Sequence, residues 1–150
     1  MKAHQTILSP ALIQAYLGTT YRAETNGGVI TLKIGGASRS ITTLFVESKV
    51  GSAAFITAEN PYSAPQSPPV NSERQRQLGD DRSAMGITYF PGEGQGEDPS
   101  WLAEASFLVL GLGREEASDL GRKYGQNAIV WVGSDGVPEL VLLRLSGQAL

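Results

Sequence analysis

The polar segment 57–63, which reads TAENPYS, holds the side chains with the clearest capacity for chemistry. It follows the apolar run 53–57, a pattern that predicts a short buried strand ending at Asn60-Pro61. Alpha/beta folds usually present their ligand-contacting groups at the carboxyl ends of such strands. A simpler interpretation is also open, in which Asn60 and Pro61 only form a turn.

A second set of polar residues begins at Asn71, where the sequence predicts a polar surface helix. Arg74 and Gln75 project near the amino end of this helix. An arginine can form paired hydrogen bonds with a carboxylate or a phosphate, so Arg74 is a candidate partner for an anion. Asn71 has a simpler alternative role as the cap of the helix.

Glu104 and Gln126 stand at the starts of two predicted strands in the last third of the chain. Glu104 lies two residues before a buried strand, and if drawn into the interior it needs a partner such as Arg74. Gln126 could satisfy backbone carbonyls at a helix end, which is the commoner role, or direct its amide at a ligand. Other acidic residues, such as Glu93 and Glu97, are expected to be solvated.

Composition excludes several classes of function. The 150-residue chain has no cysteine and a single histidine, His4, so we expect no metal site and no catalytic triad. Its net charge of −3 argues against nucleic acid as a partner. No stretch approaches the roughly 18 apolar residues of a membrane span, so no membrane partner is expected and a cytoplasmic location is the default.

The helices and strands that the sequence indicates, which must position these polar residues, predict one domain over residues 1–150 with an α/β or α+β fold. We expect a mixed sheet of about five to seven strands with three or four helices packed on it. The clearest signal is a C-terminal β-α-β-β unit, and the Gly-rich stretch Pro91–Ser100 is expected to be a loop that serves as a flexible connector or a mobile cover. The expected elements are helices at 10–17, 38–50, from 71, and 114–124, and strands at 20–25, 29–34, 53–57, 86–90, 106–110, 128–132 and 137–145.

Four segments carry a resemblance to a known family: AYLGTTYR near the start, AAFITAENPYS at 53–63, NSERQRQL at 71–78, and the long stretch 91–131. In the order and spacing of these segments the chain resembles a bacterial family of unknown function, number 3293. The resemblance implies kinship but no activity and no cofactor. It implies that certain polar positions are shared and lie outside the core, namely Thr57, Asn60, Asn71, Arg74, Glu104 and Gln126.

Two positions depart from the family pattern. Relatives often have Ser or Thr where Gly113 caps the last helix, and an apolar or aromatic residue where Glu59 stands. The first difference weakens a helix cap modestly. The second puts in doubt any pocket that needs an aromatic wall at position 59.

Three hypotheses of function follow. The favoured one is a binding module in which the six shared residues and the Gly-rich loop hold a small polar or anionic ligand, with Arg74 pairing the anion. The second is a hydrolase or transferase with Glu104 as general base and Arg74 as charge stabiliser. The third is a protein-interaction or self-associating structural protein that uses an exposed strand edge, which makes an oligomer a further expectation.

Overall fold

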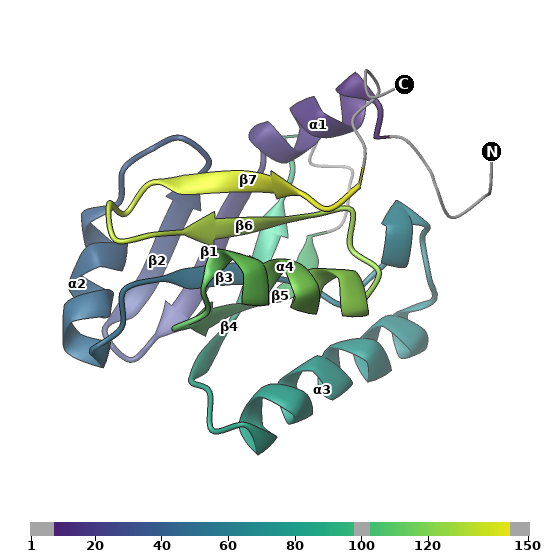
Figure 1. The fold of residues 1–150 in the computed structure, drawn as a ribbon. Helices are drawn as coiled ribbons and strands as arrows, with labels where there is room; N and C mark the ends of the chain where they lie inside the picture. Colours follow the sequence, from purple (N-terminus) through teal and green to yellow (C-terminus); the bar gives the residue numbers. More distant parts are fainter. Residues whose placement is uncertain (1–7, 98–102, 145–150) are drawn as a thin grey trace.

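The structure, a computed structural model, describes residues 8–97 and 103–144 (Figure 1). The chain forms four α-helices, a single 3-10 turn and seven strands among these residues. The elements, in chain order, are α1 (Pro10–Leu17), β1 (Thr20–Thr25), β2 (Gly28–Lys33), α2 (Arg39–Ser48), β3 (Ala53–Ile56), η2 (Pro61–Ser63), α3 (Pro68–Ala84), β4 (Tyr89–Gln95), β5 (Glu104–Leu110), α4 (Arg114–Lys123), β6 (Ala128–Val132) and β7 (Pro138–Leu142).

All seven strands join one sheet in the order β2-β1-β4-β5-β3-β6-β7. Each of the six pairings between these strands is antiparallel. The prediction of a mixed sheet, with both parallel and antiparallel pairs, is therefore wrong. The fold is α+β. The number of strands and helices agrees with the prediction. The C-terminal unit β5-α4-β6-β7 is confirmed, with β3 inserted between β5 and β6.

The sheet separates two layers of apolar side chains, because successive residues of a strand point to opposite faces. Phe55 and Leu108 pack with α2 on one face, in the cluster that also holds Leu44. Ile56 and Val109 pack on the other face, where α3 and α4 lie. Figure 1 shows α3 and α4 on the same side of the sheet, and α2 away from both of them, beside β2. Both faces of β3 are therefore buried, as its uninterrupted apolar sequence predicts.

The Gly-rich stretch is partly a strand rather than the predicted loop. Residues 91–95 belong to β4, which pairs with both β1 and β5. A Cβ atom on Gly92 would lie 2.2 Å from the backbone oxygen of Arg22 and 2.7 Å from Cζ of Phe55. Glycine is therefore required by close packing of the strand, not by loop flexibility. The rest of the predicted loop lies largely outside the described residues.

Helix α3 begins earlier than the sequence suggested. Its N-cap is Ser67, whose Oγ accepts a hydrogen bond from Val70 N, and two prolines occupy the first helical positions. The predicted capping role of Asn71 is therefore corrected. Because Ser67 caps the helix, the side chain of Asn71 is left for other contacts. No helix in the described ranges is both long and apolar enough to cross a membrane.

Candidate functional site

The segment that follows β3 has an unusual backbone. Asn60 and Tyr62 both have positive φ angles, 47° and 56°. Asparagine tolerates this left-handed conformation, whereas for a bulky residue such as Tyr62 it is an outlier that the surroundings must enforce. One enforcing contact is the hydrogen bond from Tyr62 N to the carbonyl of Gly125, at 2.6 Å. Backbone strain of this kind is concentrated at functional sites, which draws attention to residues 57–63.

Helix α3 holds this segment from one side. Asn71 Oδ1 accepts from Asn60 N, and Asn71 Nδ2 donates to Asn60 Oδ1, each at 2.9 Å. Arg74 Nε donates to the carbonyl of Ala58 at 2.7 Å. Gln75 Oε1 accepts from Ala58 N at 3.0 Å. Three residues of the first turns of α3 thus satisfy the backbone of the segment that leaves β3.

The end of α4 holds the same segment from a second side. Arg74 Nη2 donates to the carbonyl of Tyr124 at 2.6 Å, so its guanidinium bridges two backbone carbonyls. Gln126 Nε2 donates to the carbonyls of Glu59, at 3.1 Å, and Tyr124, at 3.2 Å. The helix-end role expected of Gln126 is confirmed, and the same amide also reaches the segment after β3.

The start of β5 forms the third side. Asn60 Nδ2 donates to Glu104 Oε2 at 2.8 Å, and Thr57 Oγ1 donates to the carbonyl of Ala105 at 2.6 Å. Glu59 Oε1 accepts from Ala105 N at 3.1 Å. The partner of Glu104 is therefore Asn60, whereas the sequence had suggested Arg74.

All six residues predicted as ligand-binding meet around residues 58–60. We call Thr57, Asn60, Asn71, Arg74, Glu104 and Gln126 the loop clamp. The hydrogen bonds of the loop clamp run to one another, to the backbone of residues 58–60, and to backbone groups of Gln66, Ala105 and Tyr124. Their convergence is what the sequence predicted, but the visible role of these groups is to fix a strained turn.

Two carboxyl groups in this region have shifted acidity. Burial raises the pKa of Glu104, the nearby charge of Glu59 acts in the same direction, and the hydrogen bond from Asn60 opposes both. Burial also raises the pKa of Glu59, against the effect of the Ala105 N–H. Glu104 pairs with Gly94 on β4, and Gly94 pairs in turn with Tyr21 on β1, so the three residues lie in one row across the sheet. Burial raises the pKa of the Tyr21 hydroxyl too.

A shallow cavity of about 280 Å³ opens between α3 and β5, next to the loop clamp. Its lining residues are Glu59, Ser72, Gln75, Arg76, Ala105 and Phe107, and none of the six predicted residues is among them. Gln75 is only 9% exposed, and its buried Nε2 has no hydrogen-bond acceptor in the part of the chain that the structure describes. The sequence analysis named the polar segment of Glu59 and the side chain of Gln75, but it did not include these two residues among the six predicted to bind a ligand.

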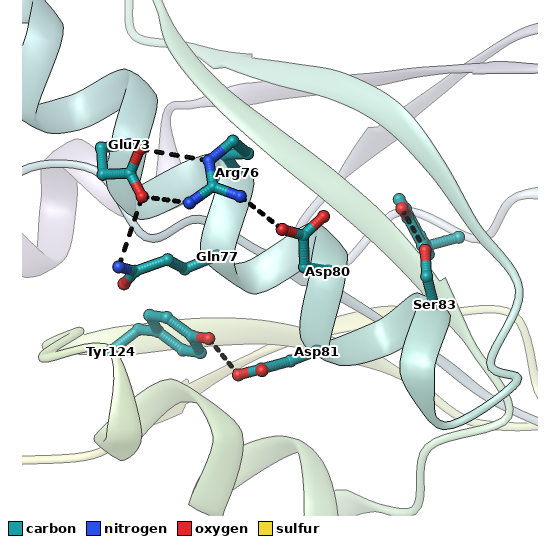
Figure 2. A network of polar contacts seen from close by, with 8 residues as sticks. Glu73, Arg76, Gln77, Asp80, Asp81, Ser83 and Tyr124 are labelled. Carbon is teal, nitrogen blue, oxygen red and sulfur yellow. Dashed lines mark hydrogen bonds and ion pairs between the residues drawn. The ribbon is translucent and has the colours of Figure 1, made fainter.

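Figure 2 shows two further sets of polar contacts on α3, one on its exposed side around Arg76 and one that joins the helix to Tyr124 at the end of α4. Arg76 pairs with Glu73 and with Asp80, the latter at 2.6 Å. Asp81 accepts hydrogen bonds from the Tyr124 hydroxyl and, at 2.9 Å, from Lys123 Nζ. These bonds lower the pKa of Asp81, and burial together with the bond to Asp81 raises the pKa of Tyr124 to about 12. Exposed pairs of this kind contribute little to stability.

The described residues contain no group of three or more His, Cys, Asp or Glu side chains that could hold a metal ion. Residues 56–129 match the family described as protein of unknown function (DUF3293). The chain resembles that family. The matched span contains the whole loop clamp and the cavity beside it. No curated protein and no solved structure matches the chain.

Proposed function

We propose that this relative of DUF3293 is a small-molecule binding protein that holds a polar ligand in the cavity between α3 and β5. The loop clamp then acts indirectly, by fixing the segment that presents Glu59 to the cavity. Preorganised polar groups around a partly apolar cavity are typical of small-molecule sites. Phe107 supplies the apolar wall, and Glu59, Ser72 and Gln75 supply polar groups.

The unpartnered donor of Gln75 is the observation that carries this proposal. Its amide oxygen is fixed by Ala58 N, so the Nε2 group has a set direction, and that group is buried without an acceptor. Leaving a buried donor unsatisfied costs about 1 to 3 kcal/mol. A ligand oxygen can reach this atom only if the side chains that cover it move, and it would then remove that cost, which favours a ligand with a carbonyl, carboxylate or hydroxyl group.

The charges near the cavity further restrict the class of ligand that it can bind. Arg74, which the sequence offered as the anion partner, has two guanidinium nitrogens committed to the carbonyls of Ala58 and Tyr124. The arginine at the cavity is Arg76, whose charge is already offset by Glu73 and Asp80. A neutral or singly charged polar ligand therefore suits the cavity better than a polyanion.

Native mass spectrometry of the full chain, incubated with a soluble metabolite extract, tests this proposal. The wild type should carry a stoichiometric mass adduct, and Gln75→Glu should lose it. That change keeps an acceptor for Ala58 N and removes the donor. Gln77→Glu is the matched control, because Gln77 lies exposed on the same helix and bonds only Glu73. A wild type without an adduct, or an adduct that survives Gln75→Glu, would contradict the proposal.

If Gln75→Glu does not fold, Gln75→Met provides the same test without a buried charge. Circular dichroism establishes folding for each variant before the mass measurement. The adduct is again expected to disappear, because Met cannot donate a hydrogen bond. An adduct of undiminished occupancy on folded Gln75→Met would contradict the proposal in the same way.

A hydrolase or transferase activity is the second candidate, and the paired carboxyls favour it. Glu59 and Glu104 both have raised pKa values, which is common for catalytic acids and bases. In this candidate Glu59 would be the general base, because it lines the cavity whereas Glu104 does not. Turnover of p-nitrophenyl acetate, a simple acylated probe, should then fall at least tenfold in Glu59→Gln. Equal rates in the variant and the wild type would reject the activity with this class of substrate.

A further inference from the structure

A second buried donor without an acceptor among the described residues, the Nε group of Arg82, lies further along α3. The inward stripe of this helix consists of Gln75, Leu78, Gly79 and Arg82, and only Leu78 is a large apolar residue. Arg82 is 7% exposed, which is unusual for a residue that stays charged at all physiological pH values. It lies about 10 Å along the helix axis from Gln75, outside the lining of the proposed cavity.

The acidic residues next to Arg82 are already paired. Asp80 bonds Arg76, and Asp81 bonds both Lys123 and the Tyr124 hydroxyl. Arg82 itself has no ion pair and no side-chain hydrogen bond to any residue in the described ranges. Its Nε is fully buried without an acceptor, while its two terminal nitrogens keep some contact with solvent.

A buried guanidinium without a direct hydrogen-bond acceptor is costly, and the cost falls when a carboxylate or phosphate accepts its paired N–H groups. Asp81 acts on Arg82 only through its charge, because its carboxylate is bonded to Lys123 and to the Tyr124 hydroxyl. We propose that Arg82 forms a binding site for a small oxyanion, either a free ion or the carboxylate or phosphate group of a metabolite. This site is distinct from the cavity at Gln75 and does not depend on it.

NMR titration of the wild-type chain tests this site directly, through the Nε–Hε resonance of Arg82. Inorganic phosphate and acetate are the two probes, and sodium chloride at equal ionic strength is the control. We expect a saturable shift of the Arg82 resonance with at least one oxyanion and none with chloride. A linear drift that is the same for all three salts would overturn the proposal.

Arg82→Met supplies an independent readout, since it removes the charge and retains an apolar side chain of similar reach. The wild type should gain roughly 3 to 6 °C in Tm when the bound oxyanion stands about tenfold above its dissociation constant. Arg82→Met should start at a higher Tm than the wild type and gain nothing. Arg122→Met, which alters an exposed arginine paired with Asp119, should keep the full gain. An equal gain in Arg82→Met and the wild type would also overturn the proposal.

Discussion

Two faces of α3 differ in whether their polar side-chain groups have hydrogen-bond partners. On the face towards β3, Asn71 and Arg74 have partners on the strained segment 58–60. On the inward stripe, Gln75 also supports this segment by accepting from Ala58 N, but its Nε2 and the Nε of Arg82 are buried without an acceptor among the described residues. The first arrangement is that of a structural support. Buried donors without an acceptor are costly unless a bound ligand provides the missing acceptor. We therefore assign structural support to the face towards β3 and ligand binding to the unsatisfied donors of the inward stripe.

Arg74→Met should give the largest loss of stability, because it removes both contacts that hold Ala58 and Tyr124 together. We expect the free energy of unfolding to fall by about 2 to 3 kcal/mol. Urea denaturation followed by circular dichroism measures this. Arg122→Met, an exposed control, should change it by no more than about 0.5 kcal/mol. A loss as small as that of the control would mean that the clamp does not support the turn.

Substitutions at Asn60 separate strain from hydrogen bonding. Asn60→Ala and Asn60→Gly both remove the bonds to Glu104 and Asn71, but only glycine adopts φ 47° without a steric cost. Asn60→Ala should therefore be less stable than Asn60→Gly by roughly 1 kcal/mol. Denaturant midpoints of the two variants provide the comparison. Equal midpoints would show that the left-handed backbone at this position is not maintained in solution.

The fold class and the polar cluster could be predicted from the sequence because both depend on local patterns. The apolar run at 53–57 and the turn residues after it identify a strand end, and Asn71 and Arg74 identify a polar helix start. Strand β4 was predicted at 86–90 but lies at Tyr89–Gln95, since Gly92 and Gly94 indicate a loop until the neighbouring Arg22 and Tyr21 are placed beside them.

Local sequence patterns could not predict the role of the loop clamp residues, because that role depends on tertiary contacts. Whether Arg74 faces an anion or two backbone carbonyls depends on where the end of α4 lies, some 50 residues further along the chain. The unsatisfied donor of Gln75 is likewise a property of its tertiary surroundings, because its amide is ordinary in sequence.

A smaller effect is expected in the dependence of stability on pH. The pKa of Glu104 is raised on folding, so the folded state holds its proton to higher pH than the unfolded state does. Stability is then highest below the ordinary glutamate pKa and declines as pH rises through the raised value. Glu104→Gln should flatten this decline in urea denaturation series between pH 4 and 8. An identical decline in the variant would assign the effect to Glu59 or to another group.

The most direct test compares Arg74→Met and Gln75→Glu, two neighbouring positions on opposite sides of the proposed division. Unfolding free energy and the occupancy of the metabolite adduct are measured for both at a temperature where each is folded. Arg74→Met should lose stability while keeping part of the adduct, and Gln75→Glu should lose the adduct altogether, whatever its buried carboxyl group costs in stability. Full adduct occupancy in Gln75→Glu with its loss in Arg74→Met would place binding on the clamp and contradict the division between support and binding.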